Sequence, residues 1–100
     1  KSETMAPSKI PSSDNQEWWD DFKNLLEDQY DFPSLYLFKF IAPKEQMADL
    51  KEVFIGNDID VKASSKGKYQ SVTSRILVDS SQEIIDIYQR AGSIEGVISL

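Results

Sequence analysis

The stretch "DIDVKASSKGKYQSVTSRILV", Asp58 to Val78, decides the fold, because it has the pattern of two strands joined by a tight turn. Apolar and polar residues alternate on both sides of the turn, which is the period of a strand with one buried face. The loop Lys66–Lys68 between them carries a glycine, and glycine adopts the positive φ that a hairpin turn needs. We therefore predict a β-hairpin with strands over 58–64 and 69–78.

The segments on either side of this hairpin predict a complete domain over residues 32–100. "SLYLFKFIA" at 34–42 is rich in aromatic and aliphatic residues and predicts a strand. Apolar residues at helical spacing predict helices over 43–56 and 80–92, and "GVISL" at 96–100 predicts a last strand. Two strand–helix–strand crossovers that share one hairpin give an α+β, ferredoxin-like βαββαβ sandwich. Its antiparallel four-stranded sheet has the order fourth, first, third, second.

The segment before this domain divides into two parts. Residues 1–13 are rich in serine and proline and lack a hydrophobic period, so we expect a disordered tail. Residues 14–31 predict an acidic amphipathic helix that is additional to the βαββαβ unit. Its apolar face is formed by Trp18, Trp19, Phe22, Leu25 and Leu26.

The first predicted strand has two different apolar sides. We expect Tyr36, Phe38 and Phe40 to face the helices. The open face of the sheet then carries the aliphatic residues Leu35, Leu37, Ile41 and Leu77. An exposed apolar patch of this kind marks an interface. Either the helix at 14–31 or a second copy of the chain would cover it, and we favour the helix because an intramolecular contact costs no translational entropy.

Charge is distributed unevenly along the chain, whose net charge is −6. Seven acids and one lysine between Asp14 and Asp31 give that segment a charge of −6, whereas Asp60 to Arg75 sum to +3. One interpretation of the basic hairpin is a turn that lysines keep soluble. The other is an anion site formed by Lys62, Ser64, Ser65, Lys66, Gly67, Lys68, Tyr69, Ser71 and Arg75. A further hypothesis is that the acidic helix lies near this basic corner and masks it.

Several classes of function are disfavoured by composition. The chain has no cysteine and no histidine, which removes thiolate metal sites, disulfides and the commonest general base. The hydroxyls of Ser71, Thr73 and Ser74 have no adjacent base, so we expect no enzyme, no cofactor and no metal. The longest apolar run, Leu35 to Ile41, is too short to span a bilayer, and a cytoplasmic protein is the default.

Binding to nucleic acid is an alternative that the residues disfavour. RNA-recognition motifs share the predicted strand order and carry a Lys-Gly-aromatic pattern on the third strand. Here Lys68, Gln70 and Ser71 stand where stacking aromatic residues are needed. A net charge of −6 also weakens binding to phosphates.

From Phe32 to Leu100 the chain resembles the YbeD-like family of uncharacterised bacterial proteins. The resemblance is carried by "FPSLYLFKF", "VKASSKGKYQSVT" and "IYQRAGSIEGVISL". It implies a ferredoxin-like fold, similar in shape to ACT domains, which bind amino acids and regulate enzymes. The junction where ACT domains place a glycine-containing loop is Ala42–Lys44 here and has no glycine. The resemblance implies that the motif residues of the hairpin, Lys62 to Val72, have a function beyond forming a soluble turn.

The sequence as a whole favours a non-enzymatic regulatory or interaction module. Its expected partner is another protein or a small anionic ligand, contacted through the basic hairpin. The alternatives are an ACT-like sensor of small metabolites and a nucleic-acid-binding domain. Both a monomer and a homodimer agree with the residues, because the open apolar face could be covered by the chain's own helix or by a second subunit.

Overall fold

The computed structural model describes residues 8–12, 14–64 and 66–99. Strands and helices alternate in the order that the sequence predicts, with one short strand added before the first helix. The elements are β1 (Ser8–Lys9), α1 (Gln16–Gln29), β2 (Ser34–Pro43), the 3-10 turn η1 (Lys44–Gln46), α2 (Met47–Val53), β3 (Asp60–Ala63), β4 (Tyr69–Val78), α3 (Ser81–Gly92) and β5 (Ile98–Ser99).

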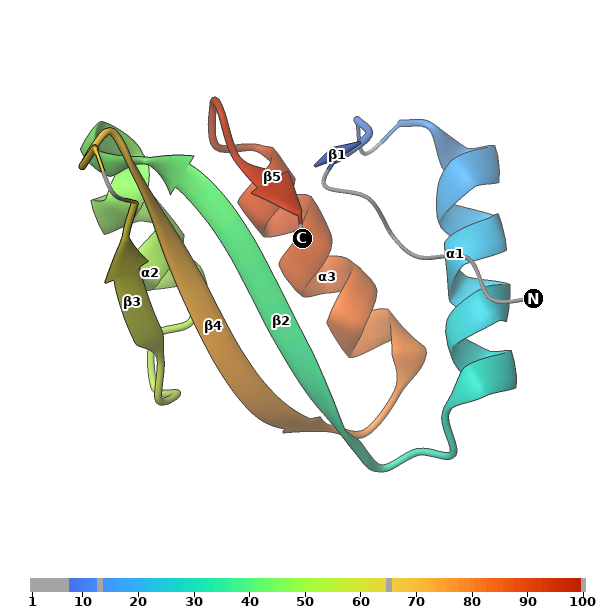
Figure 1. Ribbon diagram of the computed structural model, residues 1–100. Coiled ribbons are helices and arrows are strands. Elements are labelled where there is room, and N and C mark those ends of the chain that lie inside the picture. The colour runs from blue at the N-terminus through green and yellow to red at the C-terminus, as the bar shows by residue number, and fades with distance from the viewer. Residues whose placement is uncertain (1–7, 13, 65, 100) are drawn as a thin grey trace.

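The strands form one antiparallel sheet in the order β1-β5-β2-β4-β3. Without β1, this is the predicted order of a ferredoxin-like domain, and the fold prediction is confirmed. β2 and β4 make the centre of the sheet and pair along their whole length, from Ser34 opposite Val78 to Pro43 opposite Tyr69. In Figure 1 the helices α2 and α3 lie on one face of this sheet and leave the other face open.

The core lies between the sheet and these two helices. Phe38 and Phe40 of β2 are completely buried, as are Leu50 of α2 and Ile84 of α3. Phe38 and Phe40 both contact Phe54, with ring centroids 5.8 and 5.9 Å apart. The predicted inward direction of the aromatic side of β2 is therefore confirmed, and its aliphatic side faces outward.

The N-terminal segment differs from the expected disordered tail over residues 8–12. β1 pairs with β5, and Ile10 is buried. A Cβ atom at Gly92 would lie 2.7 Å from Cγ2 of Ile10, so the glycine leaves the space that the isoleucine fills. The indole Nε1 of Trp19 also donates a hydrogen bond to the carbonyl of Ser12, at 2.8 Å. Ile10 is a single apolar residue without a hydrophobic period around it, so the sequence pattern did not predict this contact. Residues 1–7 and 13 of the predicted tail lie outside the described part.

Helix α1 forms within the predicted segment 14–31 but lies elsewhere than expected. It begins after Asn15, whose side-chain oxygen accepts a hydrogen bond from the backbone N–H of Trp18. It packs against α3, where Phe22 meets Tyr88 with ring centroids 5.1 Å apart and the Ser81 hydroxyl donates to a Glu27 carboxylate oxygen at 2.8 Å.

The prediction that α1 covers the open sheet face is therefore wrong, because α1 extends the helix layer instead. The reason is the shape of the sheet. β5 and β1 have two residues each, so the sheet narrows beyond β2 and leaves the flank of α3 for α1 to cover.

Candidate functional site

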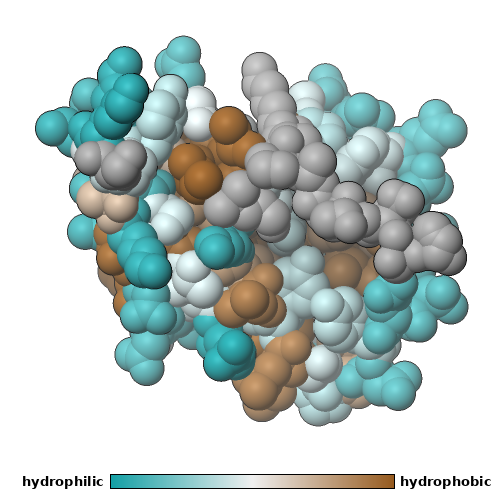
Figure 2. Space-filling view, viewed as in Figure 1, coloured by the Kyte–Doolittle hydropathy of each residue, from teal (hydrophilic) through white to brown (hydrophobic). Residues whose placement is uncertain are grey.

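The open face of the sheet exposes three large aliphatic side chains. Leu35, Leu37 and Leu77 are 58%, 49% and 62% exposed, and Leu35 stands directly opposite Leu77 in the ladder. Ile41 is half-buried at the other end of β2, where it pairs with Ser71 and Ile98. Figure 2 looks onto this face and shows apolar residues exposed between hydrophilic ones. The predicted apolar open face is confirmed, and α1 does not cover it.

Positive side chains are interleaved with these leucines. Residues that stand opposite each other in an antiparallel ladder share one face of the sheet. Arg75 is opposite Leu37, Lys39 is opposite Thr73, and Lys62 is opposite Ser71, so all three cations lie on the open face. Asp60, also opposite Thr73, brings one acid to the same face. Lys39 and Asp60 were not among the predicted site residues, although the strand period alone would have placed them here.

The basic hairpin at the end of β3 and β4 is closed by Ser64. Its backbone N–H donates to the carbonyl of Tyr69 at 2.9 Å, and its hydroxyl accepts from the backbone N–H of Tyr69 at 3.3 Å. Gly67 has φ +75°, which confirms its predicted role in the turn. Lys66 and Lys68 are both exposed at the tip.

The hairpin brings four of its predicted site residues together. Beside it lies a hollow of about 200 Å³ with Lys62, Ser64, Tyr69 and Ser71 in its lining; the other lining residues are Ile41, Ala63 and Gln70. Two of the four are opposite each other in the β3–β4 ladder, Lys62 and Ser71. This arrangement gives one cation and three hydroxyl groups, which suits a carboxylate. Ser65 lies outside the described residues.

Arg75 does not belong to this hollow, so its predicted place in the corner is wrong. It follows Ser71 by four residues along β4, which is about 13 Å in an extended strand. It lines a second hollow of about 280 Å³ on the open face, together with Leu37, Asp58, Ile59, Asp60 and Thr73. The basic residues therefore stand on three different strands of the open face, Lys39 on β2, Arg75 on β4 and Lys62 on β3, and do not converge on one point.

The tryptophan helix also differs from the predicted interface. Trp19 and Phe22 are buried between α1 and α3, so their contact is internal to the chain. Trp18 remains 38% exposed. Close to this contact, burial and then the neighbouring Tyr88 raise the pKa of Tyr36 well above its usual range, and the two hydroxyl oxygens are 3.2 Å apart.

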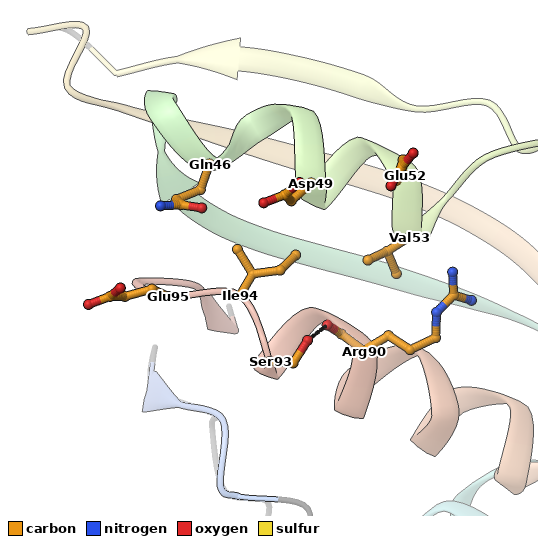
Figure 3. A pocket seen from close by; sticks show the side chains of 8 residues that line it. All are labelled: Gln46, Asp49, Glu52, Val53, Arg90, Ser93, Ile94 and Glu95. Carbon is orange, nitrogen blue, oxygen red and sulfur yellow. Dashed lines mark hydrogen bonds between the residues drawn. The ribbon is translucent and has the colours of Figure 1, made fainter.

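A further hollow, of about 530 Å³, lies between α2 and the end of α3 and was not indicated by the sequence. Figure 3 shows its lining: Gln46, Asp49, Glu52, Val53, Arg90, Ser93, Ile94 and Glu95. The hydroxyl of Ser93 is already used, because it donates to the carbonyl of Arg90 at 2.7 Å. Within the described ranges, no group of three His, Cys, Asp or Glu residues is arranged to hold a metal ion.

Comparison with known proteins agrees with this fold and places the chain in a family. The family model described as "Protein of unknown function (DUF493)" matches residues 27–100. The chain belongs to the DUF493 family. The resemblance to the YbeD-like proteins is thereby confirmed. The DUF493 match begins inside α1, so β1 and the first turns of α1 precede the family domain.

The relatives of this DUF493 domain include bacterial proteins named "UPF0250 protein". The one from Shewanella halifaxensis is 34% identical over 83 residues, which cover 76% of this chain and 90% of the relative. The one from Shewanella frigidimarina is 36% identical over 74 residues, covering 67% and 84%. No solved structure matches. Among the residues described, no helix is long and apolar enough to cross a membrane.

Proposed function

We propose that this DUF493 domain is a non-enzymatic interaction module that binds an acidic surface of a partner protein. The observation that carries the proposal is the open sheet face, where three leucines are about half exposed or more and share the face with three cations. Large exposed apolar side chains that form one patch are typical of protein interfaces. The two hollows on this face, of about 280 and 200 Å³, are smaller than the range of about 300–1,000 Å³ that is usual for ligand pockets.

Charge favours an acidic partner. The chain has a net charge of −6, yet Lys39, Lys62 and Arg75 collect on the open face and Lys66 and Lys68 extend it at the hairpin. Complementary charge accelerates association and selects partners more than it adds affinity. We therefore expect the leucines to supply most of the binding energy and the cations to orient the partner.

The hollow beside the hairpin fits this proposal better than it fits a metabolite sensor. Its volume of about 200 Å³ lies below the range of about 300–1,000 Å³ that is usual for ligand pockets. A single carboxylate side chain of the partner is small enough to reach Lys62 and Ser71 there. Binding of this kind would fix the register of the partner on the sheet.

The test is an affinity capture from lysate with four baits. They are the wild type, Leu77→Asp, the pair Lys66→Glu/Lys68→Glu, and Ile55→Asp as the matched control. Ile55 is 76% exposed in the turn after α2, so its substitution adds the same charge away from the open face. Circular dichroism should first show that all four fold alike.

We expect the wild type and Ile55→Asp to retain the same protein, and the other two baits to lose it. With that protein purified, Leu77→Asp should weaken binding by about thirtyfold, as expected for a central interface residue. Equal retention by the wild type and Leu77→Asp would contradict the proposal. Specific recovery of RNA or of a small molecule in place of a protein would instead support one of the two alternatives.

A further inference from the structure

The strand β2 is paired unequally on its two sides. It pairs with β4 at all ten of its residues, but with β5 only at Phe40 and Ile41. Successive residues of a strand turn their N–H and C=O groups alternately to opposite sides. Every second residue of Ser34–Lys39 therefore directs its backbone groups to a side where the described residues form no strand. Within the described part of the chain, the backbone bonds of turns and loops include none to these six positions.

The two free strand edges of this sheet differ in how well they resist pairing with another chain. β3, the edge strand on the other side, has four residues, and both Asp60 and Lys62 put charges on it. Short and charged edges resist pairing with other chains. The free edge of β2 is longer and carries Leu35, Tyr36, Leu37 and Phe38 in succession before Lys39. Its first five residues, Ser34 to Phe38, carry no charge, and Lys39 at its end is the one charged residue of this segment.

A row of aromatic side chains extends from this edge across α3 to α1. The hydroxyl of Tyr36 lies 3.2 Å from that of Tyr88, whose ring centroid is 5.1 Å from Phe22, and Phe22 is 5.3 Å from Trp18. Tyr36 is half-buried, although Phe38 and Phe40 on the same face are completely buried. Trp18, at the other end of the row, is also partly exposed. The row is thus an apolar layer that the sheet covers only as far as β2.

We propose that the edge Ser34–Lys39 accepts an extended segment of a partner protein as an additional strand, antiparallel to β2 and in line with β5. The register of β5 indicates this line, because Ile98 stands opposite Ile41 and Ser99 opposite Phe40. A strand that continues β5 in the same register would place its next residue opposite Lys39 and its later residues toward Ser34. The added strand would cover the aromatic row. This inference rests on the proposed function, because the added strand comes from a protein partner. The edge that binds it is separate from the hairpin.

The chemistry of the edge specifies the segment. Residues directly opposite Leu35 and Leu37 would be apolar, and the residue opposite Lys39 would be acidic, since such cross-strand pairs stabilise a ladder. A second copy of the chain fits less well. Pairing β2 with its own counterpart would continue both sheets and place a second helix layer where α1 already lies beside α3. A single strand brings no such layer.

The test uses the synthetic hexapeptide Glu-Thr-Val-Thr-Val-Thr. In an antiparallel arrangement with the glutamate opposite Lys39, its two valines stand opposite Leu37 and Leu35. Its control has the same sequence with alternate amides N-methylated, which removes the ladder donors and keeps the side chains. Amide hydrogen exchange of residues 34–39 is measured by NMR on the full chain. We expect slower exchange at every second residue and at least about tenfold weaker binding of the methylated peptide, since it cannot form several hydrogen bonds. Lys39→Glu should weaken binding of the glutamate peptide and favour a lysine version.

A second arm avoids the need for high intrinsic affinity by fusing the hexapeptide directly after Ser99, in place of Leu100, so that the register of β5 puts its glutamate opposite Lys39. Tethering gives the peptide a high effective concentration. The proposal is overturned if the fused strand leaves these amides unprotected, or if both peptides bind equally. Protection of the amides that face away from β4, if already present in the free chain, would overturn it as well: protection independent of concentration would mean that the chain itself covers the edge, and protection that depends on concentration would mean that a second copy does. Leu77→Asp and the hairpin variant leave this edge intact, so failure of the open face and failure of the edge give different results.

Discussion

At the scale of single residues, Gly92 and Ile10 are the pair that holds the N-terminal segment to the domain. Alanine at position 92 would improve the helix propensity of α3, by at most about 1 kcal/mol because Gly92 is the last residue of the helix. It would also put a Cβ atom 2.7 Å from Cγ2 of Ile10, which is too close. We therefore expect Gly92→Ala to displace Ile10 and to lower the free energy of unfolding.

This expectation is checked by urea denaturation of Gly92→Ala, Ile10→Ala and the double variant. In the Ile10→Ala background only the Cβ of residue 10 remains, 3.1 Å from the Cβ added at 92, so the alanine at 92 should cost less stability there than in the wild type. The coupling between the two sites should reach about 1 kcal/mol or more, because they are in contact. Additive effects of the two substitutions would show that the residues do not touch.

Tyr36 predicts how stability depends on alkaline pH. Burial, followed by the neighbouring Tyr88, raises the pKa of Tyr36 in the folded chain above its ordinary value near 10. Below the ordinary value near 10, Tyr36 is protonated in the folded and in the unfolded state, and the free energy of unfolding is at its full value. Above it, the unfolded state loses the Tyr36 proton first. The free energy of unfolding should then fall by about 1.4 kcal/mol per pH unit from this residue.

The measurement is a series of urea titrations from pH 8 to pH 11.5 on the wild type and Tyr36→Phe. The difference between the two curves should be flat below about pH 10 and then slope. A flat difference over the whole range would mean that Tyr36 titrates normally in the folded state.

Residue patterns predicted the turn better than they predicted the site. Gly67 was identified because a hairpin of this kind needs positive φ, and its φ is +75°. Arg75 was grouped with the hairpin lysines because it is near them in sequence and shares their charge. An extended strand separates such residues by about 3.3 Å per position, so the counting that gave the faces also argues against the grouping.

At the scale of elements, the position of α1 determines which substitutions change the fluorescence emission of its two tryptophans. Trp18 and Trp19 lie next to Phe22, which contacts Tyr88 of α3, whereas Leu37 is on the opposite face of the sheet. Leu37→Asp should therefore leave the tryptophan emission unchanged. Tyr88→Ala should shift it to longer wavelength, because it removes the ring that packs on Phe22. A shift in Leu37→Asp, with the fold intact by circular dichroism, would place α1 on the open face after all.

The sequence could predict that α1 is amphipathic but could not predict the surface it covers. An apolar stripe shows that a helix needs a partner, and both the open face and the flank of α3 were available. The lengths of β1 and β5 decide between them, and these lengths follow from long-range pairing. The same limit applies to Ile10, whose partner Gly92 is distant in sequence.

At the scale of the whole molecule, acidic and basic regions are kept apart. α1 carries Glu17, Asp20, Asp21, Glu27 and Asp28 and lies at one end of the sheet, beyond β5, while β3 and the hairpin lie at the other. The longest dimension of the molecule is 38 Å. Exposed charges separated by more than about 8 Å are largely screened at physiological salt. The hypothesis that the acidic helix masks the basic corner is therefore wrong.

A charge variant tests this separation. Asp20→Asn/Asp21→Asn removes two charges from α1 and should leave affinity for the captured partner within about twofold at 0.15 M salt, because screening isolates the two ends. Titration calorimetry gives the affinity, with Lys66→Glu/Lys68→Glu as the variant that must lose it. Clearly tighter binding after neutralisation of α1 would restore the masking hypothesis.

The contact between Ile10 and Gly92 also gives a marker for comparing members of the family. The family domain begins at residue 27, so Ile10 belongs to an extension, whereas Gly92 lies inside the shared domain. Members without such an extension have no side chain to accommodate and are free to carry a larger residue at the position of Gly92. Glycine at that position, inherited together with an apolar residue shortly before the first helix, should then identify the chains that fasten an N-terminal segment to the end of their sheet.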